Sequence, residues 1–83
     1  MITVILLYDD QRWERAEWRE APLVLDWNGR SVSLRAGPRT PLPQAGRDWP
    51  PVAVYAPDEL AEEEFQELYA VHRPHVAELG LHY

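Results

Sequence analysis

The segment Ile2–Tyr8, with the sequence ITVILLY, places the strongest constraint on how this chain folds. Its residues are mostly β-branched or aliphatic, so it is predicted to be a strand. Apolar side chains point to both faces of that strand, with one set on one side (Ile2, Val4, Leu6, Tyr8) and another on the opposite side (Thr3, Ile5, Leu7). A strand of this kind is usually internal to a sheet and covered twice. The second cover must come from helices, from loops or from another subunit.

The chain of 83 residues is expected to form one domain, residues 1–83, with a thin core. It has no cysteine, which excludes disulfides, thiolate zinc sites and a cysteine nucleophile. The Ile2–Tyr8 run is too short to cross a bilayer and lacks the basic flank of a signal peptide, so a cytoplasmic protein is expected. All eight cationic side chains are arginines and eight residues are prolines, a composition compatible with a thermophile.

Residues 10–20 are predicted to form a short helix, capped by Asp9 or Asp10 and ended by Ala21-Pro22. The arginines of this segment form one stripe on a helical wheel, but no clean apolar stripe accompanies them. A charged edge strand is the alternative.

The segment PLVLDWNGRSVSLRAG predicts a hairpin centred on Asn28-Gly29, because both positions of a type I′ turn need a positive φ. This turn pairs Trp27 with Arg30 and Leu25 with Val32. The same register gathers the apolar side chains on one face (Leu23, Leu25, Trp27, Val32, Leu34).

A connection rich in Pro and Gly follows over residues 37–51, and PVAVYAP then reads as a further strand. Residues 57–79 are predicted to be helical, with Asp58 and Glu59 in the first turn and a break at Pro74. An inward stripe recurs at helical spacing along this segment (Ala61, Phe65, Leu68, His72). The predicted fold is therefore an α+β two-layer sandwich of about four strands, in the order β-α-β-β-β-α.

The three histidines and one acid of the tail, His72, His75, Glu78 and His82, are candidate metal ligands because imidazole and carboxylate groups follow one another at about one helical turn. Pro74 and Gly80 interrupt that spacing. A packed or partly exposed histidine is the competing and favoured interpretation.

Four tryptophans are many for so small a core. Trp and Arg are enriched at the centres of protein interfaces. We therefore take six side chains as candidate interface residues, with packing at the edge of the core as an equally weighted alternative (Trp13, Trp18, Trp49, Arg12, Arg15, Arg19).

No cofactor is expected, and the leading functional hypothesis is a non-enzymatic, self-associating interaction or regulatory module, most simply a homodimer. The alternative is a small metal-dependent or acid/base enzyme that uses the tail histidines. A third is a nucleic-acid-associated regulator, whose arginines would contact phosphates (Arg12, Arg15, Arg19, Arg30, Arg35). The net charge of −6, concentrated in residues 57–83, argues against that third possibility, and membrane binding is not expected.

Overall fold

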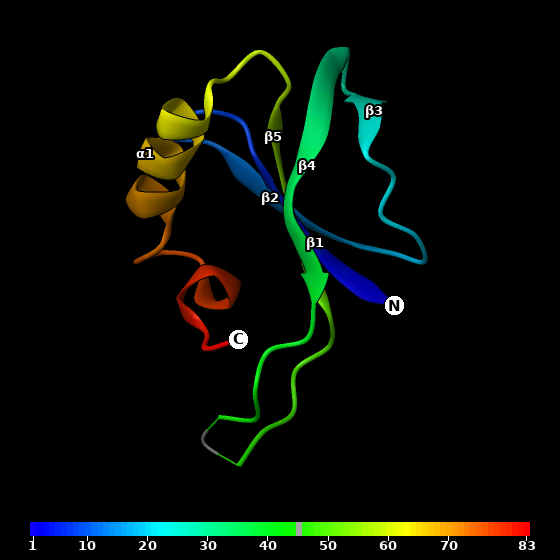
Figure 1. Ribbon diagram of the computed structural model, residues 1–83, viewed down its shortest axis with the longest axis vertical. Helices are drawn as coiled ribbons and strands as arrows, with labels where there is room; N and C mark the ends of the chain where they lie inside the picture. Colours follow the sequence, from blue (N-terminus) through cyan, green and yellow to red (C-terminus); the bar gives the residue numbers. More distant parts are fainter. Residues whose placement is uncertain (45) are drawn as a thin grey trace.

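The computed structural model describes residues 1–44 and 46–83 of the chain (Figure 1). Five strands form one mixed sheet in the order β2-β1-β5-β4-β3. A helix and a short 3₁₀ helix follow the last strand. The elements in chain order are β1 (Ile2–Leu7), β2 (Trp13–Trp18), β3 (Val24–Trp27), β4 (Arg30–Arg39), β5 (Val52–Pro57), α1 (Glu62–His72) and η1 (Ala77–Gly80).

The α+β class is confirmed, but the predicted strand count and order are wrong. The sheet has five strands where about four were expected, and all of them precede the helix. β1 lies between β2 and β5, antiparallel to the first and parallel to the second. The strand that is apolar on both sides is therefore internal, as its sequence requires.

The helix predicted for residues 10–20 is wrong, and the alternative of a charged edge strand is correct. Residues Trp13–Trp18 form β2 and pair with β1 from Ile2↔Trp18 to Leu7↔Trp13. As a strand, the segment sends Trp13 and Arg15 to one face and Ala16 and Trp18 to the other. A helix would have left both tryptophans without a shared apolar surface.

The hairpin prediction is confirmed in turn and register. Asn28 and Gly29 have φ angles of 52° and 82°, and Trp27 and Leu25 lie opposite Arg30 and Val32. The backbone N–H of Leu34 donates to the carbonyl of Leu23 at 2.8 Å, which extends the same register. The side chain of Leu23, predicted to face the core, is instead 76% exposed because it lies beyond the end of β3.

The Pro- and Gly-rich connection begins later than predicted, because β4 continues to Arg39. Gly37 permits this extension: its φ is +84°, and a Cβ there would lie 2.2 Å from the carbonyl oxygen of Val52. Farther along, Gln44 and Arg47 form an isolated bridge. Ala45, within the predicted loop, is outside the described residues.

Helix α1 begins at Glu62, five residues after the start of the predicted segment 57–79, so Asp58 and Glu59 lie in the preceding turn. Glu64 begins the helix by accepting a hydrogen bond from the backbone N–H of Ala61 at 2.9 Å. The inward positions Phe65, Leu68 and His72 are buried, whereas Ala61 is the exposed N-cap. The helix ends at His72, before Pro74, and the rest of the predicted helical segment contains only η1.

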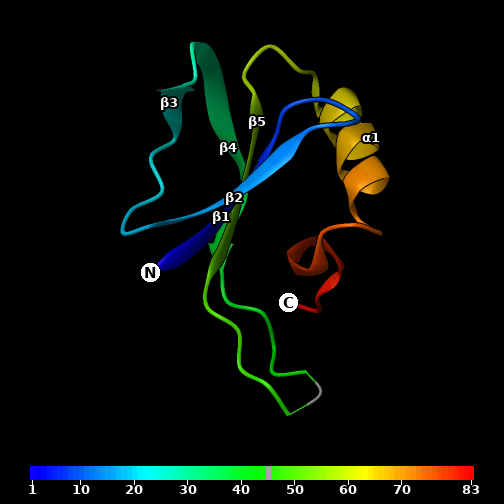
Figure 2. The same cartoon turned by 180° about the vertical axis from the view of Figure 1, so that it is seen from behind.

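One face of the sheet is covered by α1 and η1, which lie on the same side of it in both views (Figures 1 and 2). We call this the helical face. Its core consists of sheet residues and of residues from the two helices and their connection (Ile5, Leu7, Val52, Val54, Ala56, Phe65, Leu68, Val76, Leu79).

The opposite face, which we call the curled face, is covered by the sheet itself. Its buried residues come from three internal strands (Val4, Leu6, Val32, Ala53, Tyr55), and side chains of the edge strands pack over them. Trp18 of β2 packs on Trp27 of β3 with ring centroids 5.2 Å apart, and on Tyr55 at 5.4 Å. The sheet therefore curls until its two edge strands meet through tryptophan rings. The second cover of β1 comes from within the chain.

No helix in the described part of the chain is long and apolar enough to cross a membrane.

Candidate functional site

Two tight turns and one face of α1 come together at one end of the sheet. We call this region the crest. It comprises residues 8–13 of the β1–β2 turn, residues 27–30 of the hairpin turn, and the α1 side chains that face them. Figure 1 shows the β1–β2 turn close beside α1, with the hairpin turn at the same end of the sheet. Two clefts open here, and both are lined in part by Tyr8 and Arg30.

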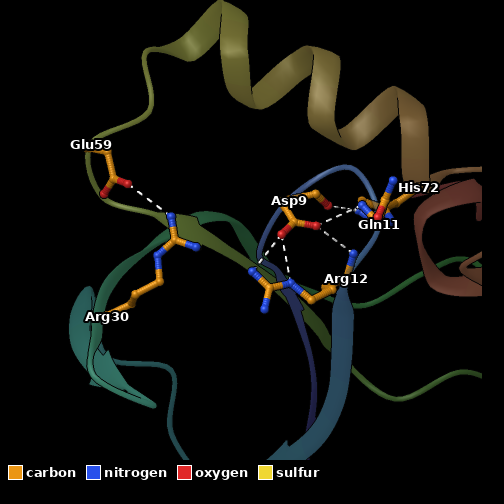
Figure 3. Close-up of polar contacts among 6 residues, drawn as sticks. All are labelled: Asp9, Gln11, Arg12, Arg30, Glu59 and His72. Atoms are coloured by element: carbon orange, nitrogen blue, oxygen red, sulfur yellow. Dashed lines mark hydrogen bonds and ion pairs between the residues drawn. The ribbon is translucent and has the colours of Figure 1, made fainter.

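Asp9 organises the β1–β2 turn (Figure 3). Its carboxylate accepts hydrogen bonds from the backbone N–H groups of Gln11 and Arg12, both at 2.9 Å, and from Nε of Arg12 at 2.8 Å. The hydrogen bond from Gln11 and then those from Arg12 lower the pKa of the Asp9 carboxyl. An aspartate that binds the backbone two and three residues ahead is a turn-forming device, which is the physical reason why β1 reverses here.

His72 fastens this turn to the end of α1. The His72 ring is 3% exposed, and its Nε2 lies 2.5 Å from the carbonyl oxygen of Asp9 (Figure 3). A carbonyl oxygen only accepts hydrogen bonds, so Nε2 carries the proton and donates it. The His72 ring thus joins two segments that lie 63 residues apart.

The first cleft, which we call the aromatic cleft, has a volume of about 500 Å³. Glu14 fixes its wall by accepting hydrogen bonds from the Tyr8 hydroxyl and, at 2.9 Å, from the indole Nε1 of Trp27. Burial, and then the hydrogen bond to Glu14, raise the pKa of Tyr8 to about 12, so the phenol stays protonated. The remaining lining residues are polar or aromatic (Gln11, Arg12, Trp13, Asn28, Arg30).

The second cleft, which we call the acidic cleft, lies between the β1–β2 turn and α1 and has a volume of about 530 Å³. Leu60, Leu68 and Val71 supply its apolar lining, and the Val71 side chain is 44% exposed. Carboxylates from the turn and from the helix also line it (Asp9, Asp10, Glu64, Glu67). Arg30 is the arginine of the lining, and it pairs with Glu59 at 3.1 Å (Figure 3).

The four candidate metal ligands of the tail lie in different environments. His72 is buried against Asp9, whereas His75 and His82 are exposed. Glu78 is buried and accepts two hydrogen bonds from Arg15, one from Nε at 2.9 Å and one from Nη2 at 2.7 Å. Within residues 1–44 and 46–83, no three His, Asp or Glu side chains lie close enough to hold a metal ion, so the structure gives the metal hypothesis no support.

The pairing of Arg15 with Glu78 was missed at the sequence level, because no local pattern links residues 63 positions apart. Burial is the largest single influence and raises the pKa of the Glu78 carboxyl, but the side-chain hydrogen bonds from Arg15, a backbone hydrogen bond and the charges of Arg15 and Arg47 together leave this pKa lowered. Glu78 is therefore a buried carboxylate matched to a specific cation. It ties β2 to the C-terminal η1.

The candidate interface tryptophans have three different surroundings. Trp18 packs inside the curled face, and Trp13 packs at the edge of the helical face with the Arg15 guanidinium 4.9 Å from its ring centroid. The Trp49 ring lies under the guanidinium of Arg47 at 4.1 Å, beside β2. Packing thus accounts for Trp18 and in part for Trp13.

Of the arginines proposed for phosphate binding, Arg12 and Arg30 line the aromatic cleft, whereas Arg15 lines a different cleft beside Trp49. Arg12, Arg15 and Arg30 are paired with carboxylates, and Arg35 donates to the carbonyls of Pro57 and Leu60. A further candidate, Arg19, is exposed after β2. Arginines gain affinity for nucleic acid by neutralising phosphates and releasing the counterions bound to them. An arginine that already pairs with a carboxylate contributes less to this gain, so these ion pairs do not favour the nucleic-acid hypothesis.

The edge strand β3 and the residue just before it, Leu23, carry exposed apolar side chains. Leu23 and Val24 are 76% and 56% exposed, and β3 is the last strand of the sheet in the part of the chain that the structure describes. The backbone N–H of Leu34 donates to the carbonyl of Leu23, so residues 23 and 34 form a hydrogen-bonded pair. By alternation along the ladder, the hairpin pairs 25 with 32 and 27 with 30 are also hydrogen-bonded. In an antiparallel ladder the alternate residues, Val24 and Asp26, therefore point their backbone groups to the open edge.

The chain matches no family model, no curated protein and no solved structure. Its functional interpretation therefore depends on the geometry of the crest and of the open edges.

Proposed function

We propose that this protein is a non-enzymatic interaction module that self-associates through the open edge of β3. The observation that carries the proposal is the exposure of Leu23 and Val24 at that edge. Natural sheets usually protect an edge strand with charge, proline or a bulge, because its free backbone groups template pairing with another chain. The edge formed by β3 is apolar at Leu23 and Val24, while Asp26 is the charged residue of this edge strand.

The two edges of the sheet differ in this respect. By the same alternation, β2 turns the backbone of Trp13, Arg15 and Glu17 outward, and two of these residues carry charges. Arg15 is also engaged with Glu78 across the helical face. A second copy can therefore add to β3 with burial of apolar surface, whereas the β2 edge resists pairing.

Native mass spectrometry and light scattering over a range of protein concentrations test this proposal, with the substitution Val24→Pro. Proline removes the outward N–H of residue 24 and leaves the hydrogen bonds to β4 in place, so the hairpin is preserved. We expect the wild type to form dimers and Val24→Pro to shift towards monomer by at least about tenfold in dissociation constant.

Val71→Asp is the matched control, because Val71 is an exposed apolar side chain on α1 and not on an edge strand. It is expected to leave the dimer unchanged. If Val24→Pro destabilises the fold, Val24→Lys tests the same edge without restricting the backbone. A wild type that is monomeric at all concentrations, or a dimer that both edge variants preserve, contradicts the proposal.

A further inference from the structure

We propose that the acidic cleft is a binding site for a basic, amphipathic segment of another protein. This site is separate from the β3 edge and adds a second kind of partner. The cleft combines an apolar lining from Leu60, Leu68 and Val71 with carboxylates on both of its sides. A segment that presents lysine or arginine next to an apolar side chain satisfies both features together.

The two sides of the cleft come from segments that are distant in sequence. Asp10 lies on the β1–β2 turn, whereas Glu64 and Glu67 lie on α1. The hydrogen bond between His72 and the Asp9 carbonyl holds these segments together, so the distance across the cleft is fixed before a partner arrives (Figure 3). A preformed cleft lowers the ordering cost of binding.

The carboxylates of the cleft differ in how far they are already engaged. Asp9 is bound to Arg12, and Glu64 accepts from the N–H of Ala61. The side chains of Asp10 and Glu67 are exposed. These two carboxylates therefore supply the charge that attracts a cationic partner, and the net charge of −6 steers such partners to the protein.

The apolar lining separates this cleft from an ordinary solvated acidic surface. Val71 is 44% exposed on a helix that is otherwise lined with glutamates, and it stands next to the buried Leu68. Covering Val71 with an apolar partner side chain removes this surface from water, which is favourable. Since the binding energy has an apolar part, affinity does not depend on charge alone.

The binding experiment uses fluorescence anisotropy with a labelled short peptide of alternating lysine and leucine residues. A peptide with glutamate in place of lysine is the probe control. We expect the lysine peptide to bind the full chain with an affinity that falls as salt rises, and the glutamate peptide to bind at least about tenfold more weakly.

The variants Glu67→Lys and Val71→Ser separate the two contributions. Glu67→Lys is expected to weaken binding about three- to tenfold through charge, and Val71→Ser about threefold at unchanged net charge. Glu20→Lys is the matched control, because Glu20 is an exposed glutamate in the β2–β3 connection, which lies across the sheet from α1 in both views (Figures 1 and 2). This control is expected to leave the affinity within about twofold of the wild type.

Three outcomes would overturn the proposal. Equal losses for Glu67→Lys and Glu20→Lys would show attraction to net charge alone. An unaltered affinity in Val71→Ser would show that the partner makes no apolar contact with Val71. Equal binding of both peptides would show that the cleft does not select a cationic partner. Because the β3 edge is not involved, these outcomes are independent of whether the protein forms dimers.

Discussion

The two faces of the sheet are covered by different parts of the chain. The helical face is covered by elements that follow the sheet in sequence, chiefly through Phe65 and Leu79. The curled face is covered by the edge strands of the same sheet, through Trp18 and Trp27. In the described residues α1 and η1 cover the helical face alone, and large aromatic side chains on the edge strands replace a second layer on the curled face.

Neighbouring residues of β1 allow a direct test of this comparison. Ile5 faces α1 and Leu6 faces the curled side, and their side chains are 0% and 1% exposed. We expect Ile5→Ala and Leu6→Ala each to lower the free energy of unfolding by about 3 kcal/mol, because each leaves a cavity in a closed core. Urea denaturation measures both.

The same measurement at several protein concentrations distinguishes the source of the cover. The loss in Leu6→Ala is expected to be independent of concentration, since the cover comes from the same chain. A loss below about 1 kcal/mol, or one that disappears in a dimer, would mean that the curl does not close this face.

Trp27→Phe tests how the curled face is held at the crest. The phenyl ring keeps most of the packing on Trp18 but removes the Nε1 donor, which binds Glu14 at 2.9 Å. We expect a loss of about 1 kcal/mol in unfolding free energy, the typical net contribution of an intramolecular hydrogen bond, because exposure of Glu14 offsets the added strength of a charged acceptor. Trp49→Phe, outside the curled face, is the control and is expected to stay within about 0.5 kcal/mol of the wild type. If the two variants lose equally, the contact with Glu14 adds nothing specific.

The smallest expected effect is a pH dependence of the unfolding free energy that arises from Glu78 on the helical face. The pKa of Glu78 is lowered in the folded protein: burial raises it, but the hydrogen bonds that Glu78 accepts and the charges of Arg15 and Arg47 together lower it by more. The ionised carboxylate thus stabilises the fold above the pKa of the unfolded state, and this contribution disappears as pH falls through the lowered pKa of the folded state.

Glu78→Gln is expected to reduce the loss of stability between about pH 7 and about pH 3 by roughly 1 kcal/mol or less, because Arg15 is half exposed. Urea denaturation at the two pH values, for the wild type and the variant, measures this difference. The carboxyls of Asp9, Glu14 and Glu59 also have lowered pKa values and contribute equally to both proteins. An identical pH dependence in the two proteins would show that the ion pair adds no net stability.

Parts of the fold could be predicted because their signals are local. The Asn28-Gly29 turn fixes the hairpin register, and the apolar pattern of Ile2–Tyr8 identifies an internal strand. The spacing of Phe65, Leu68 and His72 identifies the buried face of α1. In each case the backbone conformation and the hydrophobic pattern agree within a few residues.

The candidate site could not be predicted, because its contacts join distant segments. Nothing in the sequence near His72 indicates that its ring donates to the Asp9 carbonyl, and nothing near Trp27 indicates Glu14. The helix prediction for residues 10–20 is wrong for a related reason. Their charges do not alternate cleanly, and only pairing with β1 makes an extended conformation favourable.

The sequence by itself determined the class of the fold, the internal position of β1, the hairpin and the buried stripe of α1, since these follow from local conformational preference and hydrophobic period. Only the tertiary structure decided that β2 is a strand, that the sheet curls on itself through Trp18 and Trp27, and that the acidic cleft forms between Asp10 and Glu67. Those features depend on long-range contacts, whose free energy is gained only when segments far apart in the chain are brought together.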